Sequence, residues 1–294
     1  MITRKSRPLF LTTLCTSTTL MPVAAAAQEN QAVTGWVSPA SVGVSLTAVA
    51  LGYLFGLRRL WLRAGTARGL RLTHVGLFLG GLVLIAVLLL SRLNTFAETL
   101  LSAHMIQHFA LMLIAAPLIV LGKPGIAIFW SLSPAWRTRL HKVARHRMIQ
   151  MLTHPLGAWL IYFIVLWVWH MPPMHQAALR IESVHVVQHA SFFGAALLFW
   201  HAVFVRSRGE TRAAAFGAIF VTALHSCALA ALLTTSQVLW YPAYAGGLRM
   251  SALQDQQLGG LIMWVPCCAI LLGAALGTLA RLMSDLEQRL EHAS

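Results

Sequence analysis

Seven long apolar segments most constrain what this chain can fold into. They cover approximately residues 39–57, 74–91, 102–121, 154–170, 185–205, 213–235 and 258–280. Each is close to the length of roughly 20 residues that a helix needs to cross about 30 Å of hydrocarbon. Only 10% of the residues are charged, whereas soluble domains carry about 25%. The sequence therefore predicts an all-α membrane protein, a bundle of seven transmembrane helices.

The first 27 residues predict a signal peptide. Arg4, Lys5 and Arg7 precede a short apolar stretch, and four alanines at 24–27 follow it. A basic region, an apolar region and small residues in this order are typical of a cleaved secretory signal. We expect residues 1–27 to be removed and residues 28–294 to form the integral membrane domain. An uncleaved anchor is the alternative.

Basic residues are distributed unevenly between the two sides of the expected bundle. Sixteen lie in the loops and tail of one side, and Arg92, Arg180 and Arg249 lie in the loops of the other. Cytoplasmic loops of membrane proteins carry the excess of Lys and Arg. We therefore expect the mature N-terminus outside and the C-terminus in the cytoplasm. The formal net charge of +14 then reflects topology, and we expect no binding of nucleic acid.

Histidines recur where segments begin on the outer side. His104 and His108 open the third segment, and His185 and His189 open the fifth. Residues four apart lie on one face of a helix, so each pair places two imidazoles about 6 Å apart along the axis. Two imidazoles at this spacing make half of a metal site.

Further candidate ligands come to the same side. His170 closes the fourth segment and His175 follows it, while His225 lies in the outer half of the sixth. Ionisable groups in or beside a membrane helix are functional candidates. Imidazole suits copper and zinc, and thioether favours Cu(I). We predict a copper site, for Cu(I) rather than Cu(II) and with zinc as an alternative ion. Its candidate ligands are His104, His108, His170, His185, His189, His225, Asp255 and Met105.

The cysteines and glycines support weaker predictions. The four cysteines, Cys15, Cys227, Cys267 and Cys268, lack the spacing of a zinc ribbon or a redox CxxC motif, so we expect no disulfide framework. Cys267 and Cys268 are possible thiolate ligands, with inert packing as the alternative. Glycines four apart at 52 and 56, 76 and 80, and 273 and 277 predict faces where helices approach closely.

Several motifs also carry a resemblance to a known family. They are His104-Met105-x-Gln107-His108 with Ala116-Pro117-Leu118 after it, Trp169-His170-x-Pro172, the His185/His189 pair, and Asp255-Gln256-Gln257-Leu258 with Met263-Trp264-Val265-Pro266. Over residues 40–280 the chain resembles the polytopic CtaG family of bacterial cytochrome c oxidase assembly factors. One departure is Cys267, where the family pattern has glycine.

The resemblance implies a multi-pass protein of the bacterial cytoplasmic (inner) membrane that handles copper for a haem-copper oxidase. Its metal site would face the exterior, and its partners would be the copper-bearing oxidase subunits and periplasmic copper chaperones. It implies site residues at His104, His108, His170, His185, His189 and Asp255. The sequence shows no nucleophile–base pair or phosphate loop, so we expect no enzyme.

Two other functions use the same histidines. A haem-binding electron-transfer protein needs one imidazole from each of two opposed helices, whereas adjacent pairs on each helix favour a small ion. A copper transporter needs ligands that continue across the membrane, whereas here they become sparse below His225.

Overall fold

The computed structural model describes residues 38–244, 246 and 250–291. The expected signal peptide at residues 1–27 lies outside the described residues, and so does Arg249. The described chain is helical and contains no β-strand. This confirms the all-helical membrane fold at the level of class.

Six helical stretches of the described chain are long and apolar enough to cross a membrane. They are α2 (Pro39–Ala64), α3 (Leu72–Leu90), Leu101–Leu121, Glu182–Arg206, Thr211–Thr235 and α14 (Ala252–Glu291). The helices α10 (Pro155–His170) and α11 (Pro172–Arg180) meet at an angle of 73° and make a seventh span if the bent pair is counted as one. The described chain thus has six spans, or seven with the bent pair.

Two of these stretches change helical type along their length. Leu101–Leu121 consists of α5 (Leu101–Ala110), the π-helical turn η1 (Leu111–Ala115) and α6 (Ala116–Leu121). Glu182–Arg206 consists of α12 (Glu182–His201) and the π-helical turn η2 (Ala202–Arg206). The stretch Thr211–Thr235 lies within α13 (Glu210–Thr235). In η1 the Met112 carbonyl accepts a hydrogen bond from the Trp200 indole at 2.9 Å, which ties α12 to the turn.

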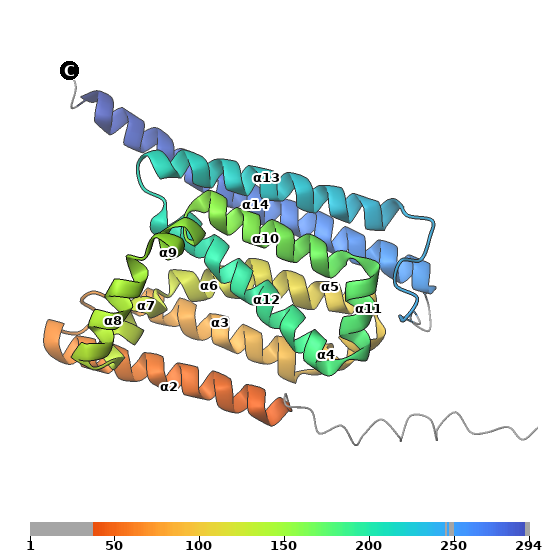
Figure 1. The fold of residues 1–294 in the computed structure, drawn as a ribbon, viewed down its shortest axis with the longest axis horizontal. Helices are drawn as coiled ribbons and strands as arrows, with labels where there is room; N and C mark the ends of the chain where they lie inside the picture. The colour runs from red at the N-terminus through yellow and green to blue at the C-terminus, as the bar shows by residue number, and fades with distance from the viewer. Residues whose placement is uncertain (1–37, 245, 247–249, 292–294) are drawn as a thin grey trace, which may run out of the picture. The chain divides into compact units, whose positions relative to one another are not determined.

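The packing of these helices forms a closed circuit. Helix α5 packs on α14, α14 on α13, α13 on α10, α10 on α12, and α12 on α6, which continues α5. Helices α13 and α14 run side by side, and α3 and α2 lie outside the circuit (Figure 1). Helix α3 packs on α6 and η1, and α2 packs on α3 and α7 (Pro124–Ser131). Large buried side chains, including Phe192, Phe199 and Trp200, fill the interior of the circuit. This arrangement brings the starts of α5 and α12 to the same end of the bundle.

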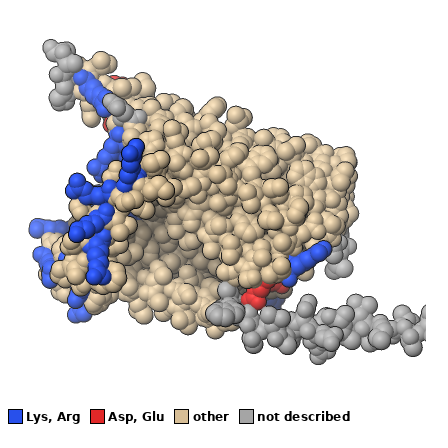
Figure 2. Space-filling model, in the orientation of Figure 1, with Lys and Arg blue, Asp and Glu red and all other residues tan. Residues whose placement is uncertain are grey.

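Short helices cover the two ends of the bundle. Helix α4 (Arg92–Thr99) lies with α11 at the end where α5 and α12 begin. Helices α7 (Pro124–Ser131), α8 (Pro134–Ala144) and α9 (Arg147–Leu152) lie at the opposite end. Lysines and arginines gather at this second end (Figure 2), as the unequal loop charges predict. We refer to it as the basic end.

Glycines permit close helix contacts at fewer places than the sequence pattern predicts. A Cβ atom on Gly56 would lie 1.9 Å from the Ala127 carbonyl oxygen, so α2 and α7 touch there. A Cβ atom on Gly260 would lie 2.3 Å from the Thr234 hydroxyl, where α14 meets α13. In contrast, the glycines at 52, 76, 80, 273 and 277 face open space. The predicted glycine faces were therefore wrong, except at Gly56.

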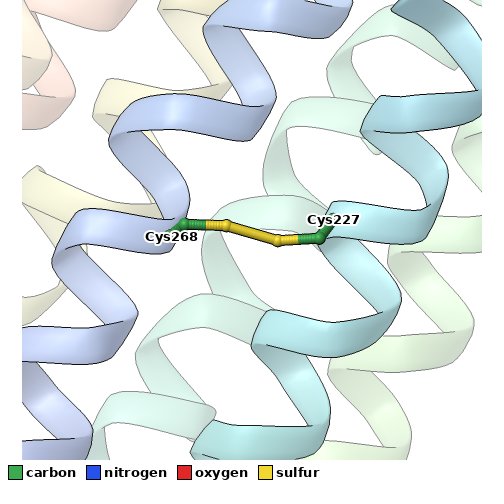
Figure 3. The surroundings of a disulfide bond; sticks show 2 residues. All are labelled: Cys227 and Cys268. Atoms are coloured by element: carbon green, nitrogen blue, oxygen red, sulfur yellow. A yellow bond between two sulfur atoms is a disulfide. The ribbon is translucent and has the colours of Figure 1, made fainter. Parts of the chain in front are cut away.

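A disulfide joins Cys227 of α13 to Cys268 of α14 (Figure 3). The sequence predicted no disulfide framework and did not indicate this single pair. The two cysteines are 41 residues apart, and they meet because α13 and α14 pack side by side over their length. Spacing rules for zinc and redox motifs do not detect such a pair. Cys267 is buried and free.

Candidate metal centre

Asp255, near the start of α14, fixes the beginning of α5. Its carboxylate accepts hydrogen bonds from the Leu101 amide at 2.6 Å and the Ser102 amide at 3.3 Å, and the Ser102 hydroxyl also donates to it. Carboxylates are strong acceptors for the free N–H groups of a helix start. The predicted ligand Asp255 therefore lies at a helix cap, with both oxygens engaged by α5.

The two histidine pairs meet across α5 and α12. The ring centroids of His104 and His108 are 4.2 Å apart, and those of His185 and His189 are 4.3 Å apart. Between the helices, the centroids of His108 and His189 are 4.7 Å apart, and those of His104 and His185 are 5.9 Å apart. The structure thus places all four imidazoles in one group.

His175 joins this group from α11. Its ring centroid lies 5.0 Å from that of His104, and the side chain is buried. The sequence places His175 on the outer side but gives it no defined role, because the 73° bend between α10 and α11 is not visible in the pattern. We call His104, His108, His175, His185 and His189 the histidine cluster.

Two tyrosines of the segment between α13 and α14 cover the cluster. The Tyr244 hydroxyl lies 3.1 Å from Nε2 of His175, and the Tyr241 hydroxyl donates to the His170 carbonyl at 2.7 Å. Burial raises the pKa of both hydroxyls above the ordinary value of 10.0, so both stay neutral near pH 7. Sequence reasoning missed these tyrosines, since tyrosine is common at membrane interfaces in any role.

Several ring nitrogens of the cluster are buried and have no hydrogen-bond partner among the described residues. These atoms are Nε2 of His104, both nitrogens of His108, Nδ1 of His175 and Nε2 of His185. Buried polar atoms are normally paired, and each exception needs an explanation. Neighbouring buried imidazoles whose nitrogens have no hydrogen-bond partner among the described residues suggest a site that takes up a cation.

A backbone contact fixes the tautomer of His170, the last residue of α10. Its Nδ1 lies 2.7 Å from the Leu166 carbonyl, and a carbonyl only accepts, so Nδ1 carries the proton. Its Nε2 then presents a lone pair, and this buried atom has no hydrogen-bond partner in the part of the chain that the structure describes. Backbone contacts of this kind fix the tautomer of metal-binding histidines.

A small cavity of about 40 Å³ lies beside the cluster. We call it the methionine cavity, because three methionines line it. Its polar and sulfur-bearing lining residues are Met105, His108, Met112, Tyr162, His170, Ser226, Met263 and Cys267. His108 belongs to both the cavity and the cluster. The structure therefore places the predicted ligands Met105 and His170 at the cavity rather than among the five clustered rings.

Gln107 connects the histidine cluster to the neighbouring helices through hydrogen bonds of its side-chain amide. Its amide nitrogen donates to the Leu88 carbonyl at 2.9 Å and to the Asn94 side chain at 3.0 Å. Both partners are acceptors, so the amide oxygen is the atom that lies 3.3 Å from Nε2 of His189. Gln107 thus links α3 and α4 to the two histidine helices and restricts the ring of His189.

His225 lies apart from the other predicted ligands. Its ring centroid is 5.0 Å from that of Phe163, and among the described residues it contacts no other histidine ring. Both of its nitrogens are buried without a partner. The structure does not bring His225 into the cluster.

The donor atoms of the cluster are not arranged around a single point. Within the described parts of the chain, no group of three or more His, Cys, Asp or Glu side chains is placed so that it could hold a metal ion. The rings are close, with interplanar angles that range from 27° for His104 and His185 to 88° for His185 and His189.

Comparison with known proteins is consistent with these features. A family model described as cytochrome c oxidase caa3 assembly factor matches residues 51–285. The chain is 24% identical over 248 residues to the uncharacterized protein Mb0105 of Mycobacterium bovis and to the uncharacterized protein MT0111 of Mycobacterium tuberculosis. Each match covers 79% of this chain and 37% of the relative, so the chain spans little more than a third of their length. No solved structure matches the chain.

Proposed function

This chain belongs to the family of cytochrome c oxidase caa3 assembly factors, and we propose that it binds copper as cargo and aids copper insertion into a haem-copper oxidase. The proposed ligands are the predicted His104, His108, His185 and His189, joined by His175. The observation that carries the proposal is the group of buried, unpartnered imidazole nitrogens on α5, α11 and α12.

The spacing of the rings fits a small ion. A metal–nitrogen bond is about 2 Å long, so imidazoles that share one tetrahedral ion have ring centroids roughly 5 Å apart. The centroid distances from His104 to His108, His175 and His189 are 4.2, 5.0 and 5.9 Å. Rotation of the rings within the existing cluster would therefore direct the nitrogens to one ion without moving the helices.

The methionine cavity favours Cu(I) over Cu(II). Soft thioether and thiol ligands select Cu(I), whereas Cu(II) prefers nitrogen and oxygen in a square-planar arrangement. Met105, Met112 and Met263 line the cavity together with Cys267. His170 and His108 add imidazole to the same lining. Zinc is the alternative ion at the histidine cluster.

The proposed location and partners follow from the family and the charge pattern. We place the protein in the bacterial cytoplasmic membrane with the histidine cluster toward the exterior, because the basic end of the bundle suits the cytoplasm. The copper-bearing oxidase subunits would then receive copper from the outer face. Periplasmic copper chaperones are the proposed donors. The protein acts as a carrier in this scheme and not as an enzyme.

Copper binding by purified variants tests the proposal. The His104→Ala/His108→Ala variant should lose copper binding, or bind at least tenfold more weakly, in competition with a chromophoric Cu(I) chelator. The side chain of His185 is less buried than that of His104. His185→Ala should therefore weaken copper binding without unfolding the bundle. His141→Ala/His146→Ala removes two exposed histidines at the basic end and is the matched control.

Copper binding, the absorption spectrum and copper flux together distinguish the proposed function from the alternatives. A double variant of α5 that binds copper like the wild type would exclude the proposed site. An intense Soret band in the purified protein would indicate a haem protein instead, because Cu(I) is d¹⁰ and has no ligand-field absorption. Copper flux across sealed vesicles would indicate a transporter.

A deletion strain tests the cellular role. We expect the oxidase subunits to be synthesised but to lack copper and activity. Added copper should restore part of the activity, because mass action replaces a delivery factor when the receiving site is intact. Fully metallated, active oxidase in the deletion strain would contradict the proposal.

A further inference from the structure

A large cavity lies toward the basic end, and along α12 its lining begins at Gly194, five residues beyond His189 of the histidine cluster. Its volume is about 850 Å³, which is within the range of sites that bind small molecules. Residues of α6, α12, η2 and α14 line it, together with the starts of α7 and α13. Neither the family nor the proposed copper site gives this cavity a role.

One wall of the cavity is an apolar face of α12. Gly194, Leu197, Leu198 and His201 line it, and their spacing of three and four residues places them on one face of the helix. This face extends about 10 Å along the axis. A Cβ atom on Gly194 would meet nothing within 4 Å, so the glycine opens onto free space. Ile119, Val120 and Ile126 add further apolar side chains to the lining.

Four basic side chains line the same cavity. They are Lys123, Arg208, Arg212 and Arg281, and the described lining residues include no aspartate or glutamate. Arg212 forms a salt bridge with Asp285 and donates to the Arg281 carbonyl at 2.9 Å. In the described chain, no salt bridge partners Lys123, Arg208 or Arg281. One end of an apolar cavity thus carries an excess of positive charge.

We propose that this cavity binds one anionic phospholipid, with its phosphate at Lys123, Arg208 and Arg281 and an acyl chain along the Gly194 face of α12. Basic pockets between transmembrane helices bind anionic lipid headgroups. A free phosphate would use the basic residues but leave the apolar wall unexplained. A zwitterionic lipid would fill the wall but gain less from the positive charge. The proposal does not depend on copper binding.

Lipid retention by the full-length protein tests this site. The protein is released from nanodiscs that contain equal amounts of phosphatidylglycerol and phosphatidylcholine with identical chains, and retained lipid is measured by native mass spectrometry. The wild type should retain phosphatidylglycerol in preference to phosphatidylcholine. Lys123→Gln/Arg208→Gln should bind it roughly 30-fold more weakly, because two favourable charges are lost. Arg139→Gln/Arg145→Gln, at the same end but outside the cavity, is the matched control.

A second variant tests the apolar wall without changing charge. Gly194→Leu places a side chain in the open space and should abolish lipid retention while the bundle stays folded. Gly217→Leu is its control, because a Cβ atom there also meets nothing within 4 Å and Gly217 does not line the cavity. Thermal unfolding in the presence of inorganic phosphate tests separately whether a free anion binds to the basic residues.

Three results would overturn the proposal. The first is equal retention of the two lipids by the wild type. The second is an equal loss in the Arg139/Arg145 control, which would indicate general surface charge. The third is stabilisation by inorganic phosphate without retention of lipid, which would indicate a site for free anions.

Discussion

At the scale of single residues, Asp255 decides how α5 begins. The carboxylate is fully buried and engages two backbone amides and a hydroxyl of α5. Hydrogen bonds to an ionised group are stronger than those between neutral groups. His104 follows these amides within one turn, so the same contact sets the position of the first histidine of the cluster.

Asp255→Ala should destabilise the protein by about 2–4 kcal/mol, because it removes a buried charged acceptor and leaves two helix amides unsatisfied. Thermal unfolding in detergent, followed by circular dichroism, measures the effect. Glu98→Ala, at an exposed position, is the control and should change stability little. If Asp255→Ala unfolded like the wild type but lost copper, Asp255 would be a ligand and not a cap.

Periodicity predicted part of the candidate site at this scale. The four-residue spacing within each pair is enough to place His104 with His108 and His185 with His189, because helix geometry alone puts such residues on one face. Periodicity did not indicate that His175 joins them, because α11 bends away from α10. It also did not show that Asp255 is engaged by backbone amides 154 residues away in the chain. Such contacts depend on tertiary packing, which local patterns do not encode.

At the scale of helices, the contact between α13 and α14 depends on Gly260. A Cβ atom there would lie 2.8 Å from the Thr234 backbone nitrogen and 3.0 Å from the Ala230 carbonyl oxygen. Backbone atoms cannot rotate away as a flexible side chain can. Any larger residue would therefore push the two helices apart.

Gly260→Ala should lower stability by about 1–3 kcal/mol, because overpacking strains the interface of α13 and α14. Gly273→Ala on the same helix faces open space and should be neutral or stabilise by up to about 1 kcal/mol, since alanine favours helix. Comparison of the two unfolding temperatures removes the shared effect of helix propensity. Equal shifts in the two variants would contradict the close contact at Gly260.

Helix limits were more predictable than helix contacts. Each predicted apolar segment coincides with a helical stretch of the described chain, and most ends agree within a few residues, although one segment is only the α10 part of the bent pair. The largest difference is α14, which was expected over 258–280 and extends over Ala252–Glu291. Its polar start remains helical because Gln256 accepts from the Trp240 amide at 2.7 Å and donates to the Val238 carbonyl at 3.0 Å. Hydropathy alone treats such residues as loop.

At the scale of the whole molecule, the distribution of charge predicts topology. The basic end carries α8 and α9, while α11 and the starts of α5 and α12, which carry the histidine cluster, lie at the other end. Reporter fusions after Ser294 should show a cytoplasmic C-terminus, and a reporter inserted at Arg180 should show an exterior location. An exterior C-terminus would place the histidine cluster in the cytoplasm and contradict delivery of copper from outside.

The contact between Asp255 and α5 also has a consequence for biosynthesis. A ribosome makes α5 well before α14, and domains form progressively from the N-terminal side. Until α14 has entered the membrane, the first amides of α5 lack their carboxylate and His104 has no fixed position. A nascent or truncated chain therefore lacks a formed histidine cluster. Under the proposed function, copper loading then becomes a property of the finished polypeptide, and incomplete chains do not sequester the metal.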